Sequence, residues 1–271
     1  MGAYVLLYKS FKRFLYKHKF YMTNVQGSKM YINASDVLTS LHLIMLGVWG
    51  KCQTELFKKM VKKGDVVVDL GASIGYFTLL AARLVGKEGK VYAFEPEPRN
   101  FLLLCKNIAL NGYDNIVAIR KAVSDREGFA KLFLSDDYGS HSLYKFDNAK
   151  TPIITETVTL DNFFRKEGYH VDIIKIDVEG AEMVAFLGME KLIRENKKLK
   201  IFVEFSPYRI REAGYSPEEF LSKITEYGFK IYLIDELSGH VRCVSTRALL
   251  NYAIKHKLAD LLLIKQENTL T

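Results

Sequence analysis

Short apolar runs alternate with longer amphipathic stretches over most of this chain. The apolar runs are rich in Val and Ile, which is typical of buried strands, and they lie at 65–70, 90–94, 116–120, 171–178, 200–205, 229–234 and 259–265. Between them, apolar residues recur at helical spacing and predict helices at 78–85, 100–111, 181–194 and 217–227. Strands that alternate with helices favour a parallel sheet with right-handed crossovers, so the pattern predicts an α/β fold.

Two segments add to this alternation. Residues 128–134 and 153–159 carry alternating or Thr-, Val- and Ile-rich patterns and flank a polar stretch at 135–150. They predict an extra pair of antiparallel strands beside the main sheet.

The beginning of the chain has a different character. Apolar residues recur there at helical spacing with Lys and Arg between them, which predicts a basic amphipathic helix: Tyr4, Leu7, Tyr8, Phe11, Phe14 and Leu15. We therefore expect a basic helical extension at 1–48 and a catalytic domain at 49–271. The aromatic face could pack on that domain or on a second copy in a homo-oligomer, or residues 1–22 could lie on an anionic membrane surface.

Composition excludes several protein classes. With 271 residues, 49% hydrophobic and 26% charged, the chain is neither disordered nor collagen-like. Three separated cysteines without a CxxC pair favour a reducing, cytoplasmic setting over a disulfide scaffold or a thiolate zinc site. An apolar run of about 18 residues is lacking, so we expect no membrane-spanning helix.

The net charge of +8 is concentrated at one end. Residues 1–35 hold six Lys or Arg and no acid, whereas the other 236 residues hold 33 basic and 31 acidic residues. This distribution argues against a broad nucleic-acid-binding face.

The segment from Asp69 to Gly75 follows the first predicted strand and precedes a helix. A dinucleotide-binding turn reads GxGxxG, but here an acid stands where the first glycine is expected. Gly71 lets the backbone pass close to a ligand, and Gly75 permits close helix–strand packing. Because an acid disfavours a pyrophosphate, the turn suits a cationic ligand such as S-adenosylmethionine.

Further acids end the next strands. Glu95 ends the second strand, where a carboxylate can accept two hydrogen bonds from a ribose diol, and Pro96 stiffens the chain after it. Asp177 and Glu179 end the fourth strand, and Glu204 lies in the fifth. Asp177 and Glu179 could hold a methionine amino group, bind a divalent cation or take a proton from a hydroxyl. Glu204 could belong to the site or to a buried structural ion pair.

The chain resembles the FkbM family of S-adenosylmethionine-dependent methyltransferases. The resemblance lies between about residues 49 and 207, in segments that include GDVVVDLGASIGYFTLLAA, VYAFEPEPRNFLLLCKNIALNG, IKIDVEGAE and FVEFSP. It implies a Rossmann-like seven-stranded class I methyltransferase sheet whose last strand, at 259–265, is antiparallel.

The resemblance also implies a set of cofactor contacts. Residues around the methionine part would be Asp69, Gly71, Ala72, Ser73, Gly75 and Tyr76, together with Asp177 and Glu179 from the fourth strand. Glu95 and Pro96 would adjoin the ribose, and Ala122, Val123 and Ser124 the adenine. Glu55 stands where family members often carry an acid near the cofactor, whereas Ser73 departs from the Asn usual in the family.

From this we expect an O-methyltransferase that acts on a small molecule, a sugar or a glycan. Methyl transfer from a sulfonium is an in-line displacement, and a base activates a hydroxyl acceptor. Asp177 and His141 are the leading candidates for this base, with Glu204 as a third, and a divalent cation could assist. The alternatives are an RNA methyltransferase and a non-catalytic binding module with the same fold.

Overall fold

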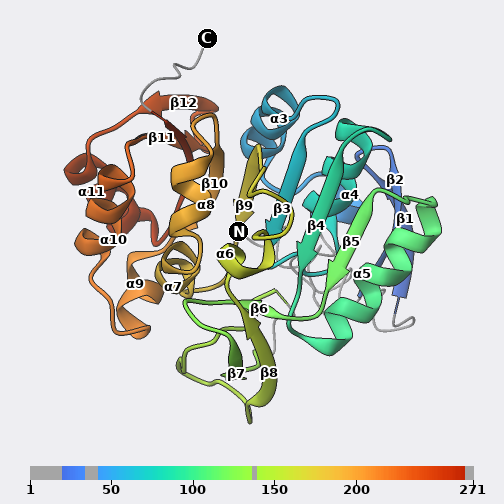
Figure 1. Ribbon diagram of the computed structural model, residues 1–271, viewed down its shortest axis with the longest axis horizontal. Coiled ribbons are helices and arrows are strands. Elements are labelled where there is room, and N and C mark those ends of the chain that lie inside the picture. The colour runs from blue at the N-terminus through green and yellow to red at the C-terminus, as the bar shows by residue number, and fades with distance from the viewer. Residues whose placement is uncertain (1–19, 34–41, 136–138, 266–271) are drawn as a thin grey trace, which may run out of the picture.

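A mostly parallel sheet of eight strands forms the centre of the molecule (Figure 1). The computed structural model describes residues 20–33, 42–135 and 139–265. The strand order is β12-β11-β13-β10-β9-β3-β4-β5. The bounds are β3 Val66–Leu70, β4 Lys90–Phe94, β5 Ile116–Ile119, β9 Ile173–Ile176, β10 Lys200–Phe205, β11 Phe229–Asp235, β12 His240–Cys243 and β13 Ala259–Lys265.

Helices cover both faces of this sheet. One face packs against α3 Lys51–Met60, α4 Tyr76–Val85 and α5 Pro98–Asn111. The other packs against α6 Leu160–Phe163, α7 Glu182–Leu187, α8 Glu190–Glu195, α9 Pro207–Glu212, α10 Pro217–Glu226 and α11 Thr246–His256. In β9, Ile173 packs in the core under α3, α4 and α5, and Ile174 packs in the core on the opposite face of the sheet. This strand is apolar at nearly every position because both of its faces are buried.

The predicted fold class is confirmed, with one correction to the strand count. β13 pairs antiparallel with both β10 and β11, as the family resemblance implies. The sheet has eight strands rather than seven because β12 pairs antiparallel with β11 at the edge. β12 could not be predicted from the sequence, because its four residues, His240 to Cys243, are mostly exposed and have no apolar pattern.

The extra pair of strands is confirmed as a separate small sheet. β7 Gly128–Leu132 and β8 Ile153–Val158 pair antiparallel, and β6 Ala122–Val123 pairs parallel with β8. This sheet lies below the central sheet in the view of Figure 1.

Residues 20–33 form a β-hairpin, so the prediction of a helical extension is wrong for this part of the chain. β1 Phe20–Val25 and β2 Ser28–Asn33 pair antiparallel, and two asparagines of α5 hold the second strand. Asn107 accepts a hydrogen bond from the Tyr31 amide, and Asn111 accepts one from the Lys29 amide. The predicted helix over Tyr4 to Leu15 lies outside the described residues. Within the described ranges, no helix is both long and apolar enough to span a membrane.

Candidate active site

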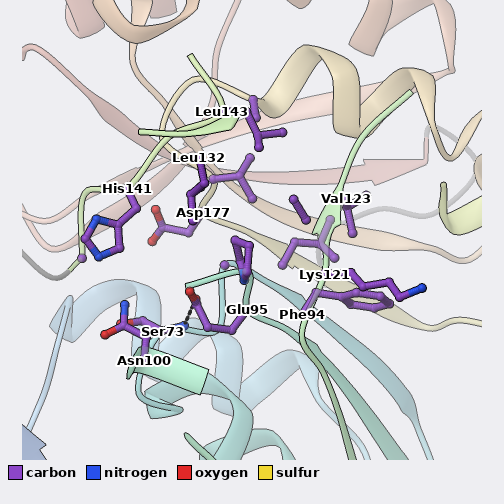
Figure 2. Close-up of a pocket in the computed structure, with 17 residues that line it drawn as sticks. Ser73, Phe94, Glu95, Asn100, Lys121, Val123, Leu132, His141, Leu143 and Asp177 are labelled. Carbon is purple, nitrogen blue, oxygen red and sulfur yellow. Dashed lines mark hydrogen bonds between the residues drawn. The ribbon is translucent and has the colours of Figure 1, made fainter. Parts of the chain in front are cut away.

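A cavity opens at the carboxyl end of β3, β4 and β9. Its wall comes from the turn after β3, the end of β4, β6, the segment 139–143 and the loop after β9. Figure 2 shows His141 and Asn100 on one side of the cavity and Lys121 and Val123 on the other, with Glu95 and Asp177 between them. This is the edge at which doubly wound sheets bind their ligands.

The turn after β3 needs glycine at position 71. Gly71 has a φ of 78°, and a Cβ placed on it would lie 1.8 Å from the carbonyl oxygen of Asp177. The amides of Gly71 and Ala72 both donate to the carbonyl of Phe94, which ties the turn to the end of β4. The backbone of three strand ends therefore converges at one point, and it leaves no room for a side chain.

The carboxylate of Glu95 lies in the middle of the cavity wall and is held by two backbone amides. The Ser73 amide donates to Oε2 over 2.8 Å (Figure 2), and the Glu97 amide donates to Oε1 over 2.9 Å. Burial raises the pKa of Glu95 to about 8, although both hydrogen bonds act in the opposite direction. Each carboxylate oxygen keeps a further lone pair, so Glu95 can still accept hydrogen bonds from a ligand diol.

Ser73 takes part in this arrangement through its backbone. Its φ is 48°, in the left-handed region that Asn tolerates better than Ser. Asn would therefore fit this position as well as Ser does, because the contact with Glu95 uses only the backbone N–H.

Asp69 does not line the cavity, because its side chain is directed toward α4. Its Oδ2 accepts a 2.6 Å hydrogen bond from the Thr78 hydroxyl of α4. Burial raises the pKa of Asp69 to about 6, against the effects of the Thr78 hydrogen bond and the charge of Lys175.

Only some of the residues predicted to lie near the adenine reach the cavity. Ala122 and Val123 line the cavity, as does Pro96, but Ser124 lies beyond it. The carbonyl oxygen of Ser124 lies against Gly188, where an added Cβ would approach it to 2.0 Å. Ser124 therefore packs against the chain just after α7.

Three of the predicted acids come together. Asp177, Glu179 and Glu204 each offer a carboxylate oxygen, and these atoms lie within 4.8 Å of one another. Lys175 Nζ lies 3.2 Å from Asp177 Oδ2, and Arg209 Nε lies 3.4 Å from Glu179 Oε2. Burial raises the pKa of Glu179 to about 8, and burial together with the neighbouring acids raises that of Glu204 well above its usual value. Such a group could hold a cation or accept a proton.

His141 lines the cavity, but its hydrogen bond does not suit the predicted base. Nδ1 accepts a 3.0 Å hydrogen bond from the Ser135 amide, so the proton of the neutral ring is on Nε2. Burial lowers the pKa of His141. In this arrangement the ring can donate a hydrogen bond but has no lone pair left to accept a proton.

Some predicted cofactor contacts are not brought to the cavity. Glu55 is exposed on α3 and pairs with Lys58 at 2.8 Å, whereas Gln53 of the same helix points inward and donates to Asp260. The Tyr76 hydroxyl lies 2.9 Å from that of Thr54. The cavity wall also includes residues that sequence reasoning missed, among them Asn100, Lys121, Leu132 and Leu143. They come from a helix, a loop and the small sheet, and no local motif marks them.

Comparison with known proteins agrees with this topology. Residues 69–231 match the model of the methyltransferase FkbM domain, which spans more than half of the chain. The chain belongs to the FkbM methyltransferase family. The predicted family, and with it the class of S-adenosylmethionine-dependent methyltransferases, is confirmed.

Individual relatives match over varying lengths. The chain is 28% identical over 187 residues to the 31-O-demethyl-FK506 methyltransferase FkbM of Streptomyces tacrolimicus, covering 67% of this chain and 70% of that protein. It is 39% identical over 75 residues to a tRNA(Phe) aminocarboxypropyltransferase of Methanocaldococcus jannaschii, which is 27% of this chain and 30% of that protein. A crystal structure of methyltransferase FkbM from Methylobacillus flagellatus superposes with a TM-score of 0.44 at 15% identity, over 97% of this chain and 60% of that one.

Proposed function

We propose that this protein transfers the methyl group of S-adenosylmethionine to a hydroxyl oxygen of a small molecule, sugar or glycan. The observation that carries the proposal is the position of one carboxylate, Asp177, which lines the same cavity as Glu95 and has one of its oxygens held by Lys175. The relative from Streptomyces tacrolimicus, which is named for a 31-O-demethyl substrate, supports transfer to oxygen.

The residues of the cavity fit the donor. Gly71 lets the turn after β3 pack directly against the backbone of Asp177, so that both line one cavity, and Glu95 presents lone pairs for the ribose hydroxyls. Ala122, Val123 and Leu132 supply an apolar surface at the other end for the adenine. The donor brings an already activated sulfonium methyl, so the protein has to bind, orient and accept a proton.

Asp177 is the base in this proposal. Lys175 holds one of its oxygens, and the carboxylate faces the cavity (Figure 2). A base in hydrogen-bond reach of an acceptor hydroxyl accelerates such transfers by about 10²–10⁴-fold. His141 is not this base, because its Nδ1 lone pair already accepts the hydrogen bond from the Ser135 amide.

An RNA acceptor is the second candidate, because one relative acts on tRNA(Phe). That match covers 27% of this chain, and the nearly balanced charge beyond residue 35 does not favour a large phosphate contact surface. A divalent cation at the three acids would lower the pKa of an acceptor hydroxyl.

Two experiments test the proposal. Calorimetry with S-adenosylhomocysteine should show binding that Glu95→Gln weakens; if the wild-type protein shows none, the protein is a binding module of the methyltransferase fold. Incubation of cell extract with labelled S-adenosylmethionine, followed by mass analysis, should then place the label on an oxygen of a small molecule or glycan. Label in RNA would establish the alternative instead.

A further inference from the structure

A row of charged side chains crosses four neighbouring strands at the carboxyl end of the sheet. Asp69 on β3 is the register partner of Lys175 on β9, and Glu204 on β10 is the partner of Asp260 on β13. On each of these four strands, the charged residue is two positions away from an apolar residue that packs in the core under α3 and α4. These apolar residues are Val67, Ile173, Phe202 and Leu262. Side chains two apart on a strand share a face, so the four charged groups point the same way.

Lys175 is the buried cation of this row. Its side chain is 1% exposed, with Nζ 3.2 Å from Asp177 Oδ2 and 5.2 Å from the ring centroid of Phe77. Its charge also interacts with those of Asp69, Glu204 and Asp260. An ammonium is expensive to bury without partners, and here the surrounding carboxylates compensate it.

Arg209 supplies a second positive charge to the acids near the cavity. Its guanidinium lies 3.4 Å from Glu179 and 4.7 Å from the ring centroid of Phe146. Two of the three acids that come within 4.8 Å of one another are thus paired with a cation of the protein itself. A divalent cation placed among them would lie close to the ammonium of Lys175, and the two would repel each other.

We propose that Lys175 is a positioning residue that supplies the positive charge at this end of the site, so that methyl transfer requires no divalent cation. The inference rests on the proposed function, because it assigns Asp177 to the reaction. The ammonium orients the carboxylate of Asp177 toward the cavity, and its positive charge compensates the acids that a metal ion would otherwise compensate.

Metal titration tests this without an identified acceptor. The full-length protein, Asp177→Asn, Lys175→Met and Lys175→Gln are titrated with Mg²⁺ and Mn²⁺ in a calorimeter. Wild-type protein and Asp177→Asn should show the same weak binding. Removal of the ammonium should tighten Mn²⁺ binding by at least about tenfold, because a repelling charge is gone and three acids remain. The matched control is Lys175→Met/Asp177→Asn, in which this gain should disappear.

Two results would overturn the inference. The first is metal binding by the wild-type protein that Asp177→Asn abolishes. The second is a folded Lys175 variant that gains no affinity. If both Lys175 variants fail to fold, the comparison of wild-type protein with Asp177→Asn still decides. Binding of S-adenosylhomocysteine is measured separately on wild-type protein, so its loss counts against the proposed function and not against the role of Lys175.

Discussion

Substitution of Gly71 by Ala tests the convergence of strand ends that shapes the cavity. The added Cβ would lie 1.8 Å from the Asp177 carbonyl oxygen, although contacts below 3.0 Å essentially do not occur. A left-handed φ costs a residue with a Cβ about 1–2 kcal/mol, and overpacking adds about 1–3 kcal/mol. We therefore expect Gly71→Ala to lower the free energy of unfolding by about 2–5 kcal/mol, out of a total of about 5–15 kcal/mol.

Gly112→Ala is the matched control. Gly112 has a φ of 63° at the end of α5, and no atom lies within 4 Å of the position of its Cβ. This variant should lose about 1–2 kcal/mol and bind S-adenosylhomocysteine normally. Gly71→Ala should lose more stability in urea denaturation and should also lose binding, because the Gly71 turn and Asp177 must move apart. Equal stability and equal affinity in the two variants would refute the reasoning.

Three further predictions concern single residues. At about pH 9, where Glu95 with its pKa of about 8 is ionised, Glu95→Gln should weaken S-adenosylhomocysteine binding about 10–100-fold in calorimetry, since charge-assisted hydrogen bonds contribute about 1.5–3 kcal/mol; an unchanged Kd would remove Glu95 from the site. Burial raises the pKa of Glu182 to about 7, so the unfolded chain ionises first as pH rises, and stability should fall between about pH 4.5 and 7 by up to about 1.4 kcal/mol per pH unit. Glu182→Gln should flatten this slope in denaturation curves, and an identical slope would contradict the assignment. His141→Ala should reduce the transfer rate without shifting the acidic limb of its pH profile, whereas loss of that limb would restore His141 as the base.

Much of the site was predictable because its parts lie in short motifs. Gly71, Glu95 and Asp177 each follow a strand directly, Ser73 lies two residues beyond Gly71, and the carboxyl ends of parallel strands meet at one edge. Glu55, which was expected near the cofactor from the family resemblance, does not reach the cavity. Two residues along a helix turn the side chain by about 200°, so Gln53 points inward while Glu55 is exposed.

Local pattern determined the alternation of strands and helices, the antiparallel position of β13 through its family resemblance, and the acid-and-glycine turn. These features depend on residues close together in the chain, where apolar periodicity and backbone conformation act. Tertiary structure alone decided the partners of Lys175, the tautomer of His141 and the hairpin on α5. Each of these depends on a contact between strands, loops or helices whose register and packing are set by the whole core, which no local pattern encodes.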